Sequence, residues 1–522
     1  MLNKKLLPML LCLLLSGLLA APLRAADFLL FYSNDGHGET EPCGCRARQL
    51  GGLARQALQL SQITAKEQRP ALFLSGGGLL FRQTSVQEEQ KRQELINAEG
   101  IAEAMRAMDC RALGLEAHDL AGGIALLKQW QEKHQLAWLS MNLVDAKKKQ
   151  PVFAPYLLTE LAGIQIAVLG LTGSLDAAPD KADYLLLPWK EALSKTLAQV
   201  SGKADMIILL SSYPYEVNKE IAEANPGVHL LLASGPGATG NNPFMVGSTL
   251  FAQTGARGKT LGMMRVAWTE AGRWEDSDLT KIRLEQSKLD QLNAQLGKLK
   301  PEDKERQRLL AEKQQIEKNI KLLREKKKPE GEAPNLCRFS NDFIELDAAL
   351  PEDQKVRGIL DQAKQRLADL NQERAAAAER AVVMNTLAGW ERCAVCHPAQ
   401  AEFWQKTRHA ASLQPLEKKK QQLNEDCLLC HVTLPYYEAD KVKAEKLLLQ
   451  VAEQHRRVSC ESCHGPAAAH AAKPNEIPAP RPKPAAPVCL GCHTPEHDGN
   501  FVFADKVEKV RCPAGSTTER QR

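Results

Sequence analysis

The last quarter of the chain contains four copies of the pentapeptide Cys-x-x-Cys-His. The copies are Cys393-Cys396-His397, Cys427-Cys430-His431, Cys460-Cys463-His464 and Cys489-Cys492-His493. In this pattern two cysteine thiolates bond covalently to a haem, and the adjacent histidine binds the haem iron. Zinc needs four ligands for each ion and gives no reason for a histidine after every second cysteine. The spacing therefore predicts four c-type haems.

Each iron has a second axial position, and the region from Asn385 to Arg522 contains no methionine to fill it. Histidine on both sides of the iron, with a low reduction potential, is the expected state. Four further histidines are candidate distal ligands: His409, His455, His470 and His497. A solvated histidine beside two arginines is the alternative for His455. In that case one haem, for example the one at His431, would be five-coordinate and open to a small ligand.

Residues around these sites also match a known pattern. The matching segments are Trp404 to Ala410, Cys460-Glu461-Ser462-Cys463-His464-Gly465-Pro466 with His470 downstream, and Cys489 to His497. Together they resemble the tetrahaem cytochrome c-554 family over roughly residues 385 to 505. The resemblance implies that His409, His470 and His497 are distal ligands.

The amino terminus is typical of an exported protein. A short basic stretch ends at Lys5, an apolar stretch runs from Leu6 to Leu19, and small residues follow Arg24. This pattern predicts a signal peptide over residues 1–26, without a lipid or membrane anchor, and a periplasmic mature protein. Its loss lowers the formal net charge from +5 to about +2. The charge gives no reason to expect nucleic acid as a partner.

Residues 27–270 have the composition of an α/β domain. Short β-rich runs alternate with helical stretches: Phe28 to Tyr32, Ala71 to Leu74, Ile164 to Leu171, Met206 to Leu210 and His229 to Ala233. Three motifs stand in this region: Asn34 to Gly38, Gly51 to Arg55 and Gln253 to Gly262. These motifs resemble the N-terminal domain of periplasmic 5′-nucleotidases. The resemblance implies the calcineurin-like metallophosphatase fold, a four-layer α/β/β/α sandwich.

The same resemblance implies a two-metal site, but most of its ligands are replaced. Asp35, His37 and His118 occupy three ligand positions, whereas the bridging aspartate aligns with Gly78. The remaining histidine positions align with Ser212 and with Ser234 to Gly237. Glycine has no side chain with which to bind a metal, so the pattern predicts a domain without phosphatase activity.

Two cysteines follow the first of these motifs closely. Cys43 and Cys45, in Glu41-Pro42-Cys43-Gly44-Cys45-Arg46, are expected in the loop above the former metal site. They are candidates for a reducible disulfide or for one soft metal ion together with His37 or His118. The alternative is a structural role, for example a disulfide with Cys110.

Between the two domains, residues 271–384 are highly charged and have a heptad-like pattern. Leucines and isoleucines recur at steps of three and four residues on both sides of Pro301, which predicts an antiparallel helical hairpin with its turn at Lys300 to Asp303. A further helix is expected from Glu352 to Ala381. These helices are either a spacer that packs within the chain or an oligomerisation surface.

Residues 385–522 provide only 138 residues for four haems, too few for an ordinary core, so the haems themselves must form most of it. Helices are expected at Glu402 to Leu413 and Asp440 to Gln454. The expected function is electron transfer between redox protein partners, with the nucleotidase-like domain as a binding or docking module. The alternatives are a haem enzyme that reduces a small nitrogen oxide and an active metal-dependent phosphoesterase.

Overall fold

The computed structural model describes residues 25–43, 49–88, 90–236, 242–275, 277–297, 304–325, 336–377, 386–418, 420–434, 451, 453–494, 498 and 501–513. The chain forms two compact units. The first contains residues up to His37, 56–85 and 105–345, and the second contains residues 38–55, 86–104 and 346–522. The predicted signal peptide lies outside the described residues, except for its last two positions.

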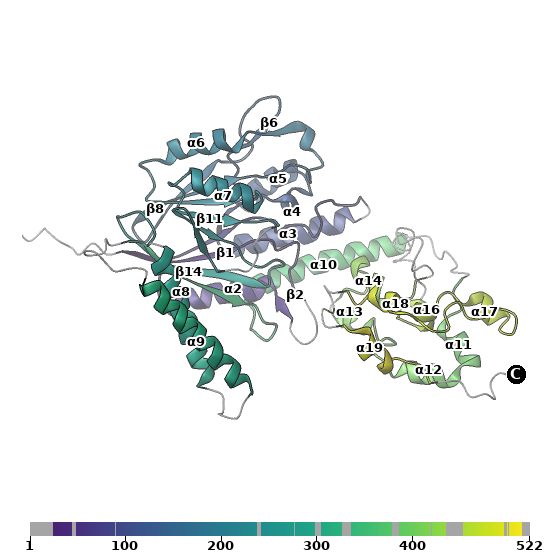
Figure 1. Ribbon diagram of the computed structural model, residues 1–522. Helices are drawn as coiled ribbons and strands as arrows, with labels where there is room; N and C mark the ends of the chain where they lie inside the picture. Colours follow the sequence, from purple (N-terminus) through teal and green to yellow (C-terminus); the bar gives the residue numbers. More distant parts are fainter. Residues whose placement is uncertain are drawn as a thin grey trace, which may run out of the picture. The chain divides into compact units, whose positions relative to one another are not determined.

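The first unit is built on two sheets (Figure 1). The first sheet has the order β15-β14-β1-β4-β5, and its strands are β1 (Ala26–Ser33), β4 (Ala71–Ser75), β5 (Cys110–Leu113), β14 (Thr260–Trp268) and β15 (Arg338–Glu345). Strands β1, β4 and β5 are parallel, while β14 and β15 are antiparallel to their neighbours. The runs of leucine, phenylalanine and tyrosine in β1 suit a strand that is buried on both faces.

The second sheet has the order β12-β13-β11-β10-β8-β7. Its strands are β7 (Tyr156–Leu161), β8 (Ile164–Leu171), β10 (Met206–Ser211), β11 (Leu230–Ala233), β12 (Phe244–Val246) and β13 (Thr249–Ala252). The four central strands are parallel, and antiparallel strands close both edges. All the strands predicted from residues 27–270 are therefore present, within one or two residues of their expected ends.

The main core lies between the two sheets. Alternate residues of β1, such as Phe28 and Leu30, pack in one cluster with Ile166 and Val168 of β8. The intervening residues of β8 face the opposite side, where they pack with α6 (Trp189–Val200) and α7 (Tyr215–Ala224). These clusters show two sheets that face each other and one layer of helices on the outer face of the second sheet. The complete four-layer sandwich stays a prediction.

The first unit extends beyond the boundary predicted at residue 270. Strand β15 pairs with β14 from Thr260↔Glu345 to Ala267↔Arg338, so it forms the edge of the first sheet. The sequence missed this strand because it lies after a long charged insertion, and strand pairing over such a distance depends on tertiary contacts. Arg265 of β14 supports the pairing through ion pairs with Asp342 and Glu67.

The charged insertion contains two helices that pack on each other, and their coiled-coil character stays a prediction. Helices α8 (Ser277–Leu296) and α9 (Lys304–Glu325) bury the apolar seam in two small clusters, which contain Leu289, Ile316 and Ile320, and Leu292, Leu296 and Leu309. The predicted turn at Lys300 to Asp303 lies outside the described residues apart from its flanks. Association of this hairpin with a second copy stays a prediction.

The second unit contains the long helix α10 (Gln354–Ala377), close to the predicted bounds, with Val356, Leu360 and Leu370 buried. A hairpin of β2 (Pro42–Cys43) and β3 (Leu50–Gly51) belongs to the same unit. Glu41, next to β2, forms ion pairs with Arg357 and Lys364 of α10. The segment that contains Cys43 is therefore fastened to α10.

Short helices follow α10 in the haem-motif region. They are α11 (Trp390–Cys396), α12 (Pro398–Gln405), α13 (Gln414–Lys418), α14 (Glu425–His431), α16 (Cys460–His464), α17 (Ala468–Ala472), α18 (Ala486–Leu490) and α19 (Phe503–Lys506), with 3-10 turns at Glu453–His455 and Val507–Lys509. The helix expected over Glu402 to Leu413 ends at Gln405, because the chain turns at Lys406. Most of the second expected helix lies outside the described residues. Within the described part of the chain, no helix has both the length and the apolar character needed to cross a bilayer.

Candidate functional site

Among the described residues, the site residues predicted from the sequence fall into two groups, one in each unit. In the first unit they lie in loops that follow the carboxyl ends of parallel strands. Asp35 and His37 follow β1, Gly78 follows β4 and His118 follows β5. Parallel strands bring their carboxyl ends to one edge of a sheet, which is the usual place for a ligand site in such folds. The structure therefore brings together the three surviving ligand positions that the sequence identified.

Asp35 is 2% exposed, and hydrogen bonds surround its carboxylate. Oδ1 accepts from the Gly235 backbone N–H at 2.7 Å, and Oδ2 accepts from Asn34 Nδ2 at 2.6 Å and Gln253 Nε2 at 3.1 Å. Burial raises the pKa of Asp35 to about 6, although these hydrogen bonds act in the opposite direction. Both oxygens of the Asp35 carboxylate thus accept hydrogen bonds from protein groups.

Gly78, at the position of the bridging aspartate, cannot accept a side chain without rearrangement. Its φ is +76°, and a Cβ atom there would lie 2.7 Å from Asp35 Oδ1 and 3.1 Å from the Asp35 Cα. The Asp35 and His37 backbone N–H groups donate to the carbonyls of Gly77 and Gly78 at 2.8 and 2.9 Å, so the two loops are tied together. A side chain at position 78 would therefore require the Asp35 loop to move.

Asp119 holds the glycine loop in this position. Its carboxylate, 1% exposed, accepts from the backbone N–H groups of Gly78 and Leu79 at 2.6 and 2.8 Å. It also accepts from Glu116 N at 3.0 Å, which completes a capping box at the start of α4 (Ala117–Leu120). Burial raises the pKa of Asp119 to about 6. The spacing of Glu116 and Asp119, three residues apart, is the sequence signal that could have predicted this cap.

His37 and His118 stack on each other, with ring centroids 3.9 Å apart and an interplanar angle of 17°. Burial lowers the pKa of His37 to about 4, and the charge of His118 adds to this effect. Burial is the largest single effect on His118 and acts to lower its pKa, but the 2.9 Å hydrogen bond from Nδ1 to Glu116 Oε2, together with the negative charges of Glu116, Asp119 and Asp35, raises it overall. The pair therefore combines a neutral imidazole with one that favours protonation.

The residues present do not fit the two-metal site of the resembling phosphatases. Ser212 uses its hydroxyl within the fold, since Oγ donates to the Leu115 carbonyl at 2.6 Å and accepts from Gly173 N at 2.9 Å. Gly237 lies outside the described residues. Around Asp35, His37 and His118, the described residues bring no three ligand atoms within 4.8 Å of one another. The absence of phosphatase activity stays a prediction.

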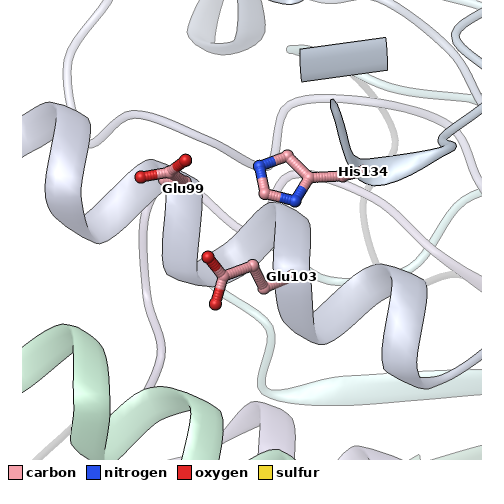
Figure 2. Close-up of side chains that lie close together, drawn as sticks. All are labelled: Glu99, Glu103 and His134. Carbon is pink, nitrogen blue, oxygen red and sulfur yellow. The ribbon is translucent and has the colours of Figure 1, made fainter. Parts of the chain in front are cut away.

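Glu99 and Glu103 form another acidic pair, one turn apart on α3 (Lys91–Ala107); Figure 2 shows them with His134 of α5 (Ile124–His134). Arg366 of α10 supplies a positive charge to both glutamates, at 3.2 and 3.7 Å. These ion pairs account for the two carboxylates as packing contacts between helices. The additional metal ion expected in the N-terminal domain stays a prediction.

The cysteines outside the pentapeptides differ in their surroundings. Cys110 is a buried free thiol whose Sγ donates to the Ala112 carbonyl, so the suggested disulfide with Cys110 is wrong. Cys337 is also a buried free thiol, and Cys512 is exposed. Cys45 and the side chain of Cys43 lie outside the described residues, and the proposed redox or metal-binding role of this pair stays a prediction.

In the second unit, each pentapeptide begins on a short helix; the first three end at or beside the carboxyl end of that helix, and the fourth continues past it to His493. Helices α11, α14 and α16 carry the cysteines of the first three pentapeptides, and α18 carries Cys489 of the fourth. A helical turn brings the two cysteines of Cys-x-x-Cys to one side, because residues three apart share a face. Haem attachment at these twelve residues stays a prediction from the sequence.

The structure brings four of the predicted axial histidines together in two pairs. The rings of His397 and His470 have centroids 6.4 Å apart, and those of His409 and His493 have centroids 6.2 Å apart. Metal–imidazole bonds are about 2 Å long, so two rings on opposite sides of one metal have centroids roughly 6 Å apart. Both pairs have the separation that one haem iron would require. In each pair one histidine comes from a pentapeptide and one does not.

Several of these histidines are oriented by hydrogen bonds through Nδ1. The bonds run from His431 to Ser412 O at 2.5 Å, His464 to Arg481 O at 2.8 Å, His470 to Ile477 O at 2.6 Å and His493 to Asp498 Oδ2 at 2.9 Å. Donation of Nδ1–H fixes the tautomer and leaves Nε2 as the basic nitrogen, the arrangement typical of metal-binding histidines. The residues present therefore fit a haem at each of these positions.

His455 is 3% exposed, which excludes the alternative of a solvated histidine. Within the described residues, its Nδ1 has no hydrogen-bond partner. A Cβ atom placed on Gly389, just before α11, would lie 3.6 Å from its Cε1. An unpartnered buried imidazole nitrogen keeps His455 among the candidate ligands. His497 lies outside the described residues.

Comparison with known proteins agrees with this division of the chain. Residues 392–465 match the family described as cytochrome c554 and c-prime. The match covers the first three pentapeptides and His409, but not the fourth pentapeptide. The chain is thus similar to this cytochrome family in its C-terminal region.

The N-terminal region is similar to 5′-nucleotidases and metallophosphoesterases. It is 27% identical to a 5′-nucleotidase of Vibrio cholerae serotype O1 over 209 residues, which cover 38% of this chain and 36% of that protein. It is 34% identical to the uncharacterized metallophosphoesterase YunD of Bacillus subtilis over 95 residues, 18% of this chain and 21% of that protein. The chain thus spans about a third or less of the length of these two relatives.

A solved structure also resembles this chain. The 5′-nucleotidase precursor of Thermus thermophilus has a TM-score of 0.46 and 18% sequence identity, with coverage of 66% of this chain and 60% of that chain.

Proposed function

We propose that this protein is a secreted electron carrier with four covalently bound c-type haems, most of them held by histidine on both sides. The observation that carries the proposal is the pairing of His397 with His470 and of His409 with His493, at 6.4 and 6.2 Å. The four pentapeptides and the match to the cytochrome c554 family support it.

Under this proposal each pentapeptide supplies two thioether bonds and one proximal ligand. His470 and His409 are the distal ligands for the irons at His397 and His493. His455 and His497 are the candidates for the irons at His431 and His464. When bound, haem iron exchanges one electron between the ferric and ferrous states. The chain's own residues orient four of these imidazoles, those of His431, His464, His470 and His493, through Nδ1.

The nucleotidase-like unit is proposed to act as a binding or docking module without hydrolytic activity. Three features support this: the glycine at position 78, the hydrogen-bonded carboxylate of Asp35 and the serine at position 212. Its partners are proposed to be the redox proteins that donate and accept electrons. Phosphate release by the purified protein with added divalent metal ions would contradict this part of the proposal.

Mass spectrometry and optical spectroscopy test the electron-transfer function. Protein produced in a host that matures c-type cytochromes should carry four covalent haems, with spectra dominated by low-spin iron. A substantial high-spin fraction would favour the alternative of a haem enzyme that reduces a small nitrogen oxide at an open iron.

A further inference from the structure

Glu461 is a buried charged residue inside the third pentapeptide, between Cys460 and Cys463. Its side chain is 1% exposed. Oε1 accepts from the backbone N–H groups of Ala388 at 2.8 Å and Ala467 at 2.9 Å, and Oε2 accepts from that of Gly389 at 2.9 Å. Three N–H donors directed at two oxygens suit a carboxylate, which has only acceptor sites when ionised.

The bonds to this carboxylate come from neutral backbone groups. Within the described residues, no lysine or arginine forms an ion pair with Glu461. A buried charge stabilised by dipoles instead of a counter-ion keeps its field in the low-dielectric surroundings. The nearby groups of the same sign include Glu391 of α11, which together with Glu461 acts to raise the pKa of His455 against the larger effect of burial.

The position of Glu461 connects two haem sites. Ala388 and Gly389 immediately precede α11, which carries Cys393 and Cys396 of the first pentapeptide. Glu461 itself belongs to α16, which carries the third. One carboxylate therefore holds the first attachment helix to the third.

We propose that Glu461 is a positioning residue and a fixed negative charge that lowers the reduction potentials of the haems at His397 and His464. This inference rests on the proposed electron-carrier function. Each iron takes up one electron from a reduced protein partner, passing from ferric to ferrous, and later gives that electron to an oxidised acceptor. Glu461 itself exchanges no electron with either iron. Because reduction adds a negative charge to the site, a carboxylate nearby opposes it.

The test uses the full-length holoprotein and three variants. Glu461→Gln removes the charge at nearly constant shape, and Glu461→Asp keeps the charge on a shorter side chain. Glu402→Gln is the matched control, since Glu402 lies on α12 with a side chain 70% exposed and paired with Lys406. Haem content is measured by mass, and the four potentials by spectroelectrochemical titration.

Glu461→Gln should raise the potentials of two of the four haems, changing the ferrous-to-ferric ratio at fixed applied potential by on the order of tenfold. Glu461→Asp should keep the haem potentials close to those of the wild-type protein, and Glu402→Gln should leave all four potentials unchanged. Wild-type potentials in a four-haem Glu461→Gln protein would overturn the proposal, as would equal shifts in the Gln and Asp variants.

If Glu461→Gln fails to retain four haems, Glu461→Asp alone decides. Because this variant keeps the charge, its ferrous-to-ferric ratio at fixed applied potential should stay within about twofold of the wild-type ratio. A tenfold change in that ratio would overturn the proposal. Failure of the electron-carrier function itself is distinguishable, because the wild-type protein would then lack the four haems whatever residue stands at position 461.

Discussion

The two sites use their ligand atoms in opposite ways. In the first unit the oxygens of Asp35 accept hydrogen bonds from Asn34, Gly235 and Gln253, and Gly78 leaves no room for a bridging carboxylate. In the second unit hydrogen bonds hold histidines such as His464 and His470 through Nδ1 and leave Nε2 for a metal. The difference between the two sites therefore lies in which candidate ligand atoms already form hydrogen bonds within the protein.

The largest expected effect comes from the haem attachment sites. Replacing Cys489 and Cys492 with serine should remove one covalent haem, because both thioether bonds are lost. The mass of the holoprotein should fall by one haem. Cys512→Ser is the matched control, since Cys512 is exposed and outside any pentapeptide, and it should leave four haems. Loss of a haem in the control would contradict the assignment of attachment sites.

The next effect concerns the proposed distal ligands. His409→Ala and His470→Ala should each convert one haem of four from low-spin to high-spin, because one axial ligand is removed. Electron paramagnetic resonance of the ferric protein measures this change. His134→Ala, in the first unit, serves as the control and should preserve the spectrum. An all-low-spin spectrum for either distal variant would show that the 6 Å ring pairs do not correspond to axial pairs.

A smaller effect tests how closely Asp35 packs against Gly78. Gly78→Ala should lower the free energy of unfolding of the first unit by roughly 3 kcal/mol, because it combines a positive φ with a close contact to Asp35. Gly163→Ala is the control: its φ is +84°, but nothing lies within 4 Å of the added Cβ. It should cost only about 1 kcal/mol.

Chemical denaturation of the two glycine variants provides the comparison. An equal decrease in the free energy of unfolding for both variants would mean that a Cβ atom fits at position 78 without a close contact. Phosphate release by Gly78→Asp with added divalent metal would show that one carboxylate is enough to rebuild the site, which would contradict the close packing inferred from the backbone.

The smallest effect concerns the α8–α9 hairpin. Ile316→Ala should cost about 2 kcal/mol, the low end for a buried isoleucine, because its cluster is small. Leu322→Ala, at a side chain that is 50% exposed on the same helix, should change stability by less than about 0.5 kcal/mol. Circular dichroism during thermal unfolding measures both. Similar losses in the two variants would place the exposed side of α9 in an interface with another copy.

Local patterns accounted for much of this molecule. The pentapeptides, the strands of residues 27–270 and the seam containing Leu289 and Ile316 depend on neighbours in the sequence, and the sequence predicted them closely. Strand β15 was missed because its partner β14 lies across a long insertion. The helix expected over Glu402 to Leu413 was too long because its turn at Lys406 depends on tertiary packing.

The candidate sites divide in the same way. Asp35, His37 and His118 were found from motifs, but the roles of Asp119 and Glu461 depend on backbone groups distant in sequence or on other helices. No spacing rule pairs His397 with His470 or His409 with His493, since each pair joins separate parts of the chain. Such pairings follow only from the folded structure.

The central claim is that four haems are bound covalently and that most are held by two histidines. Native mass spectrometry of the processed holoprotein, followed by electron paramagnetic resonance of the same sample, tests it most directly. The account predicts the mass of the polypeptide plus four haems and ferric signals that are predominantly low-spin. A colourless protein with the mass of the polypeptide alone, or one dominated by high-spin iron, would contradict it.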